Sequence, residues 1–154
     1  MGQKKRIGAL GEELVVRFLV KLCFRILERN FLRRCGELDI VAEKEGVIHF
    51  VEVKSVSHEM GASQEEGLGQ SDGDVTRETG YGVRTSYGPE SRDSYRPEDN
   101  VHPQKVARLR RIIQIYLSGR HVSDETPWQF DIATVFIDGE RRSAKINFIE
   151  DIIL

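Results

Sequence analysis

The stretch from Gly36 to Ser55 constrains this 154-residue chain more than any other part of it. Two runs rich in β-forming residues flank the pair Glu45-Gly46, a pattern typical of a β-hairpin with a two-residue loop. If those two residues form the loop, Lys44 lies opposite Val47, and the pairing continues outward with a constant sum of residue numbers.

Side-chain alternation along the two strands predicts which residues share a face of this hairpin. Continuing the pairing places Asp39 opposite Glu52, and Lys54 follows two residues later on the same face. Glu37 precedes Asp39 by two residues and is expected on that face as well. Three carboxylates and one amine therefore converge in this arrangement.

Two carboxylates roughly 5 Å apart across a ladder destabilise a sheet unless positive charge compensates them. Mg²⁺ or Mn²⁺ bound by Asp39 and Glu52 would do so, because these hard ions take oxygen ligands and leave positions open for a phosphate and a water. Lys54 could orient or deprotonate that water and stabilise the charge that develops on phosphorus. The pattern predicts metal-dependent phosphodiester hydrolysis.

The alternative is that these residues are ordinary surface charges, as most charged strand residues are. Against it, Asp39 and Glu52 are poor strand formers that interrupt apolar runs, where a buried strand would contain none. The chemical interpretation is the one that the pattern favours.

Four short segments of the chain, in this order and spacing, resemble the YraN-like family of small bacterial proteins. That family is related to archaeal Holliday-junction resolvases within the PD-(D/E)XK nuclease superfamily. The similarity resumes at residues 101–117 and at Phe130-Asp131. The four segments are Gly8-x-x-Gly11-Glu12, Ile26-Leu27-x-x-Asn30-Phe31, Gly36 to Ala42, and Phe50-Val51-Glu52-Val53-Lys54.

The resemblance implies a restriction-endonuclease-like fold and a nuclease that acts on DNA, including branched or otherwise structured DNA. It also implies Mg²⁺ or Mn²⁺ held by Asp39 and Glu52, a catalytic Lys54 and an accessory acid at Glu12. Glu37 is then expected as a partner of Lys54 that does not itself bind the metal.

Two positions depart from the family pattern. The chain has Val56 where the family usually has a basic residue shortly after Glu-x-Lys, and Gln129 where an arginine often precedes Phe-Asp. Each departure removes a candidate phosphate contact. The second hypothesis is therefore a nucleic-acid-binding module that keeps the nuclease fold but has little or no turnover.

The remaining periodicity predicts one α/β domain over residues 1–154, with a central mixed sheet flanked by helices. Helices are predicted over residues 5–22 and Pro103 to Ser118, and strands over Phe24 to Phe31, Trp128 to Ile137 and Lys145 to Phe148, in addition to the hairpin.

Residues 57–100 differ in composition from the rest of the chain. They hold seven of the fourteen glycines, with ten acidic residues and four arginines giving a charge of −6, whereas the remainder carries +4. No period of 2 or 3.6 is sustained there, so a long, flexible, acidic Gly/Ser-rich insertion is predicted. A tolerated surface insertion is favoured, and a lid or a docking segment for a protein partner remains open.

Basic residues approach the hairpin from two sides. Arg33 and Arg34 immediately precede it, and Lys105, Arg108 and Arg111 flank the apolar stripe of the predicted second helix. In a nuclease they would contact DNA phosphates, whereas in isolation they would be solvated surface charges.

No apolar run approaches the roughly 20 residues that span a bilayer, so neither a membrane protein nor a membrane partner is expected. Two isolated cysteines give no disulfide framework, and a cytoplasmic location follows from these features. Whether two copies form a homodimer is left open.

Overall fold

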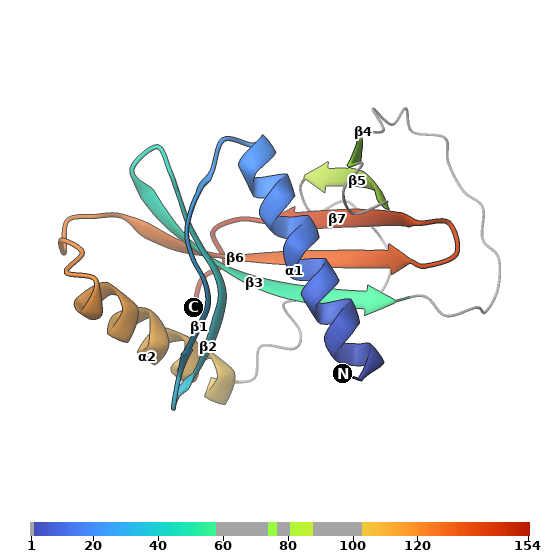
Figure 1. Cartoon of the computed structure of the whole chain (residues 1–154). Coiled ribbons are helices and arrows are strands. Elements are labelled where there is room, and N and C mark those ends of the chain that lie inside the picture. Colours follow the sequence, from blue (N-terminus) through green and yellow to red (C-terminus); the bar gives the residue numbers. More distant parts are fainter. Residues whose placement is uncertain (1, 58–73, 77–80, 88–102) are drawn as a thin grey trace.

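The computed structural model describes residues 2–57, 74–76, 81–87 and 103–154, and forms the predicted α/β architecture (Figure 1). One mixed sheet is flanked by two helices. In chain order the elements are α1 (Gln3–Lys21), β1 (Arg25–Arg33), β2 (Gly36–Lys44), β3 (Val47–Ser57), β4 (Asp74–Thr76), β5 (Tyr81–Tyr87), α2 (Pro103–Gly119), β6 (Trp128–Asp138) and β7 (Ser143–Ile149).

The seven strands lie in the order β1-β2-β3-β6-β7-β5-β4. Parallel pairing joins β3 to β6 and β5 to β7, and the other neighbours are antiparallel. The β3–β6 pairing runs without interruption from Ile48 opposite Trp128 to Ser57 opposite Ile137. The strand that carries Glu52 and Lys54 is therefore central and fixed on one side along its whole length.

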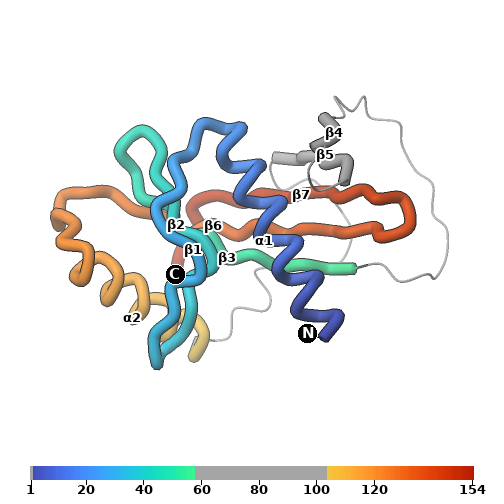
Figure 2. The backbone as a smooth tube through the Cα atoms, in the orientation of Figure 1, coloured from blue at the N-terminus to red at the C-terminus, as the bar shows by residue number. Residues whose placement is uncertain are grey.

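The two helices cover opposite faces and different halves of the sheet (Figure 2). Leu14, Val15, Phe18 and Leu19 of α1 join an apolar cluster with inward residues of β6 and β7. A second cluster joins Leu109, Ile112, Ile113 and Tyr116 of α2 to the hairpin strands and to Phe130 and Ile132 of β6. Each helix buries a stripe with helical spacing, as the sequence pattern predicts.

The hairpin register is confirmed. Lys44 lies opposite Val47, and the ladder continues to Ile40 opposite Val51. Both loop residues adopt left-handed conformations, with φ of 52° at Glu45 and 83° at Gly46. Positive φ at both central residues is what a type I′ turn requires.

Within residues 57–100, where the sequence shows no sustained period, the structure describes two strands. Strands β4 and β5 form an antiparallel pair, and β5 pairs in parallel with β7. The sequence gives little indication of these strands, because β5 pairs with β7 through backbone hydrogen bonds, and this pairing requires no alternation of apolar side chains. The predicted flexibility concerns residues that lie mostly outside the described part of the chain.

A membrane-spanning helix is not found among the described residues, where neither helix combines the necessary length and apolarity.

Candidate active site

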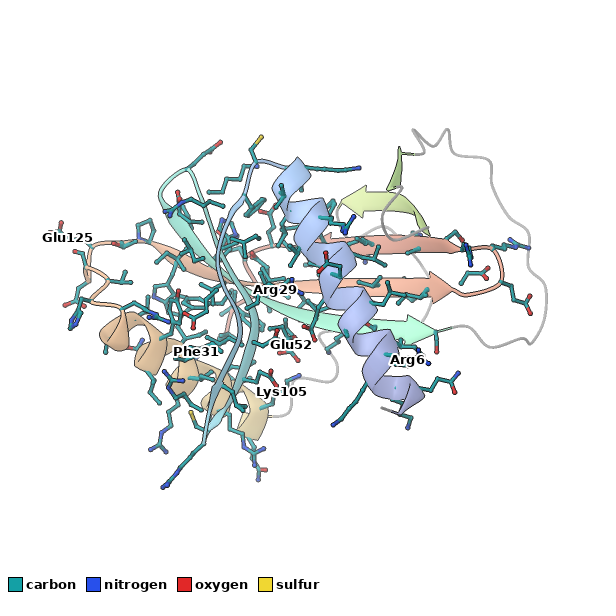
Figure 3. All side chains as sticks on the ribbon, in the orientation of Figure 1. Arg6, Arg29, Phe31, Glu52, Lys105 and Glu125 are labelled. Carbon is teal, nitrogen blue, oxygen red and sulfur yellow. The ribbon has the colours of Figure 1, made fainter. Side chains whose placement is uncertain are left out.

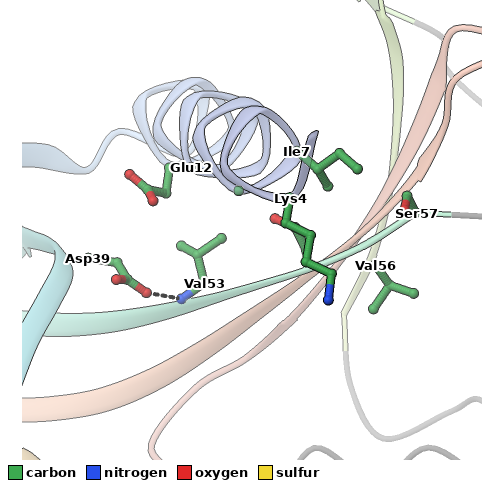
Figure 4. A pocket seen from close by; sticks show the side chains of 9 residues that line it. Lys4, Ile7, Glu12, Asp39, Val53, Val56 and Ser57 are labelled. Carbon is green, nitrogen blue, oxygen red and sulfur yellow. Dashed lines mark hydrogen bonds between the residues drawn. The ribbon is translucent and has the colours of Figure 1, made fainter. Parts of the chain in front are cut away.

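Asp39 lies where β2 separates from β3. Regular pairing of the two strands ends at Ile40 and Val51. Beyond this point Asp39 Oδ2 accepts a hydrogen bond of 2.7 Å from the backbone N–H of Val53 (Figure 4). This side-chain bond stands where the next backbone hydrogen bond between β2 and β3 would be. On its other edge β2 stays paired with β1, with Leu38 opposite Phe31.

The predicted sharing of one face by strict alternation fails at Asp39. Leu38 and Val41 both join the apolar cluster beneath α2, whereas Ile40 joins the cluster beneath α1. Residues 38 and 40 would lie on the same face of a regular strand, so β2 changes its facing at Asp39. This change, together with the bond to Val53, sets the direction of the Asp39 carboxylate.

Asp39 opens into a pocket of about 460 Å³ on the α1 side of the sheet. Figure 4 shows Asp39 and Glu12 approaching this pocket from β2 and α1. Gly8 of α1 and Ser55 of β3 also line it. The structure therefore brings the predicted accessory acid to the predicted metal ligand.

Burial raises the pKa of Asp39 from 3.8 to about 7. The bond from Val53 opposes this effect, and the negative charges of Glu52, Glu12 and Glu37 add to the increase in pKa. Burial and these like charges together favour the protonated form of Asp39.

Glu12 is held by a residue that the sequence reasoning did not select. Asn30 Nδ2 donates a hydrogen bond of 2.8 Å to Glu12 Oε2. Asn30 adopts a φ of 51°, and asparagine is one of the few non-glycine residues that tolerate this conformation. The motif Ile26-Leu27-x-x-Asn30-Phe31 points to Asn30 in the sequence, but nothing in the motif shows that Asn30 contacts Glu12.

Glu52 projects to the α2 side of the sheet, where it meets Lys105. Lys105 Nζ lies 2.5 Å from Glu52 Oε1, and the two side chains are 39% and 18% exposed (Figure 3). The sequence predicts a phosphate contact for Lys105, and in this structure its ammonium group pairs with Glu52, a predicted metal ligand. Asp39 and Glu52 remain electrostatic neighbours, since Glu52 is the charge that most raises the pKa of Asp39.

Lys54 is half-buried on β3, one row beyond Glu52 and level with Thr134 of β6. By alternation it projects to the same side as Glu52. The buried hydroxyl of Thr134 has no hydrogen-bond partner among the described residues. Glu37 is exposed near the start of β2 and contributes its charge to the surroundings of Asp39.

The chemistry of the donors fits a hard divalent cation. Carboxylate oxygens are the ligands that Mg²⁺ and Mn²⁺ prefer, and one or two carboxylates with waters are sufficient for Mg²⁺. Within the described ranges, no three His, Cys, Asp or Glu side chains gather closely enough to form a complete metal cage. Asp39 and Glu52 are the two residues that could hold such an ion in an open site. Asp39 lines the pocket on the α1 side, and Glu52 contacts Lys105 on the α2 side.

Four of the predicted DNA-binding residues meet in one groove of about 680 Å³. Arg33 ends β1, Arg34 lies in the turn that follows it, and Arg108 and Arg111 come from α2. Small residues that include Ala107 also line the groove. Among the residues that the structure describes, no carboxylate lines this arginine groove. The Arg33 guanidinium lies 4.0 Å above the Phe31 ring, which restricts its orientation.

The Phe130-Asp131 pair has a structural role here. Asp131 is fully buried, and its Oδ2 lies 2.7 Å from His49 Nδ1. Its Oδ1 accepts hydrogen bonds from Gln129 Nε2 and from the backbone N–H of Asp151. Gln129, one of the two departures from the family pattern, thus belongs to a buried cluster joining β3, β6 and the C-terminal residues.

These features define an α/β protein whose mixed sheet and flanking helices are compatible with a nuclease-like core. A family model described as "Uncharacterised protein family UPF0102" matches residues 11–73, the part of the chain that carries Glu12, Asp39, Glu52 and Lys54. The chain belongs to the UPF0102 family.

Full-length similarity supports this membership. A UPF0102 protein of Campylobacter hominis is 30% identical over 155 positions that cover all of both chains. Another, from Syntrophomonas wolfei, is 31% identical over 150 residues, which cover 94% of this chain and 95% of the relative. A third, from Caldicellulosiruptor bescii, is 28% identical over 147 residues and covers 96% of each chain.

Proposed function

We propose that this protein is a metal-dependent phosphodiesterase that cleaves DNA, with the reaction centred where β2 leaves β3. The observation that carries the proposal is the environment of Asp39. A partly buried carboxyl whose pKa is raised to about 7 by burial and by the charges of Glu52, Glu12 and Glu37 is an arrangement that a bound cation would stabilise.

Asp39 and Glu52 are the residues that would hold Mg²⁺ or Mn²⁺. Such an ion, when bound, supplies positive charge that favours nucleophilic attack at phosphorus and stabilises the leaving oxygen. Asp39 Oδ2 accepts the hydrogen bond from the Val53 N–H, which restricts the orientation of the carboxylate. This fixed orientation reduces the reorganisation required during the reaction.

Lys54 and Glu12 act on the reactants themselves. An ammonium group at Lys54 would donate hydrogen bonds to the attacking water or to the phosphate oxygens that gain charge. Glu12 faces the pocket beside Asp39 and is oriented by Asn30, so it can accept a proton or a hydrogen bond from water there.

The arginine groove supports DNA as the substrate class. Arg33, Arg34, Arg108 and Arg111 form a groove lined by positive charge, without a carboxylate in the part of the chain that the structure describes. Such a groove suits the phosphates that flank a cleavage position, because arginine binds phosphate through paired N–H donors.

The proposal is tested by incubating purified protein with Mg²⁺ or Mn²⁺ and labelled duplex, flap and four-way-junction DNA. Cleavage is expected for at least one substrate, and Asp39→Asn and Lys54→Met should each reduce the rate at least about 100-fold. Glu45→Gln is the matched control, because it removes a carboxylate from the exposed hairpin loop. Equal cleavage by wild type and Asp39→Asn would overturn the assignment.

A second function, nucleic-acid binding without turnover, is favoured by one observation. Lys105 neutralises Glu52 in this structure, so one predicted metal ligand already has a cationic partner. Binding that weakens as salt rises, with no cleavage in either metal, would select this alternative.

A further inference from the structure

The Glu52–Lys105 pair links the proposed metal site to the arginine groove. Glu52 belongs to central strand β3, and Lys105 belongs to the first turn of α2. Arg108 and Arg111 follow Lys105 at intervals of three residues, so all three cations lie along neighbouring positions of the helix. The span from residue 105 to residue 111 is about 9 Å along the helix axis.

We propose that Lys105 is an exchangeable cation, bound to Glu52 in the metal-free protein and transferred to a substrate phosphate when a divalent ion takes Glu52. This inference rests on the proposed function and deepens it. It makes Lys105 a positioning residue that couples metal binding to nucleic-acid binding.

Charge and position argue for the exchange. A divalent ion at Glu52 would repel the Lys105 ammonium and would bind the oxygen that this ammonium now contacts. Lys105 is 39% exposed at its side chain and has a flexible stem, so it can leave Glu52 without unfolding α2. The arginine groove begins one helical turn away at Arg108. A DNA strand bound there would have a backbone phosphate within reach of Lys105.

Thermodynamic linkage makes the exchange measurable. If the metal releases Lys105 to the DNA, then metal and DNA each increase the affinity of the protein for the other. The coupling should depend on Lys105, whereas Arg108 should contribute to DNA affinity with or without metal.

The first experiment measures Mn²⁺ affinity without DNA, from the electron paramagnetic resonance signal of free Mn²⁺. Lys105→Gln removes the competing cation and should bind Mn²⁺ about three- to fivefold more tightly than wild type. Arg108→Gln is the matched control, since it removes a positive charge one turn away that contacts no carboxylate among the described residues. Its Mn²⁺ affinity should increase by less than about twofold.

The second experiment measures binding of a fluorescein-labelled duplex by polarisation, with and without Mn²⁺, and verifies by gel that the duplex stays intact. Mn²⁺ should strengthen binding by wild type, and Lys105→Gln should lose most of this gain while its metal-free affinity changes little. Arg108→Gln should weaken binding in both conditions. Thermal unfolding of each variant confirms that it is folded.

The outcomes separate the two proposals. If wild type binds Mn²⁺ and Lys105→Gln binds it no more tightly than Arg108→Gln, the exchange is wrong and the metal site stands. If Lys105→Gln alone binds Mn²⁺, Lys105 holds Glu52 against the metal instead of exchanging with it, so the exchange is wrong and the wild-type protein is not a metal-dependent enzyme under those conditions. If neither binds Mn²⁺, both proposals are overturned.

Discussion

Asp39 is an acidic residue whose surroundings favour its protonated form. Burial raises its pKa from 3.8 to about 7, and the bond from Val53 opposes that effect. Between these two values the folded protein holds more protons than the unfolded chain. The free energy of unfolding should therefore fall as pH rises from about 4 to about 7, and stay reduced above that range.

Asp39→Asn should increase the stability of the metal-free protein at pH 8 by about 1–2 kcal/mol and give no gain at pH 4. Asparagine keeps an oxygen that can accept the Val53 N–H but carries no charge. Urea denaturation at the two pH values measures the difference. Glu37→Gln serves as control and should give a smaller gain, because that residue is exposed. A variant less stable than wild type at pH 8 would show that the ionised Asp39 carboxylate does not destabilise the folded protein.

At the scale of elements, the approach of α1 to β3 depends on one glycine. A Cβ placed on Gly11 would lie 1.9 Å from Ser55 Oγ, whereas a Cβ on Gly8 meets no atom within 4 Å. Both glycines lie in α1, and Gly8 lines the pocket that contains Asp39. The two positions therefore provide a matched comparison.

Gly11→Ala should destabilise the fold by about 1–3 kcal/mol through overpacking. Gly8→Ala should instead stabilise it by roughly 0.5–1 kcal/mol, because alanine is the better helix former. Chemical denaturation of the two variants tests this contrast. Adding Ser55→Ala to Gly11→Ala should recover part of the loss. Similar effects of the two alanine substitutions would disprove the close approach of α1 to β3.

The arginine groove predicts a specific salt dependence. Replacing both Arg108 and Arg111 with glutamine should weaken DNA binding and reduce the slope of log affinity against log salt by about 2, since each phosphate contact contributes nearly one. Arg141→Gln, in the exposed β6–β7 turn, is the control and should leave the slope unchanged. An unchanged slope in the double variant would show that DNA does not bind in the arginine groove.

Much of this element-level arrangement follows from sequence pattern. The Glu45-Gly46 loop fixes the hairpin register, and the apolar stripes of the two helices identify the faces that pack on the sheet. The change of facing at Asp39 does not follow, because alternation describes regular strands and β2 leaves β3 at this residue. The Lys105–Glu52 contact joins residues 53 positions apart, so no local pattern could reveal it.

At the scale of the whole molecule, a polar cluster around buried Asp131 connects β3, β6 and the C-terminal residues. His49 of β3, Gln129 of β6 and the backbone N–H of Asp151 all contact the carboxylate of Asp131. A further bond from the Ile152 N–H to the Phe130 carbonyl holds the C-terminal residues against β6. This cluster maintains the sheet that supports the proposed site without taking part in its chemistry.

Asp131→Ala should destabilise the protein by about 3–5 kcal/mol, because it leaves buried His49 and two partly buried donors without their partner. Asp138→Ala is the control. That carboxylate is partly exposed and accepts the N–H groups of Glu140 and Arg141, so a loss of about 1 kcal/mol is expected. Urea denaturation measures both effects, and a loss below 1 kcal/mol for Asp131→Ala would contradict the structural role of the cluster.

The central claim is that Asp39 and Glu52 hold one divalent cation where β2 leaves β3. Crystals soaked in Mn²⁺ and measured at the manganese absorption edge test this claim most directly. We predict an anomalous peak between the two carboxylates, with Lys105 turned away from Glu52, and no such peak in Asp39→Asn. Soaked crystals with Lys105 still bound to Glu52 and no manganese at Asp39 would contradict the account.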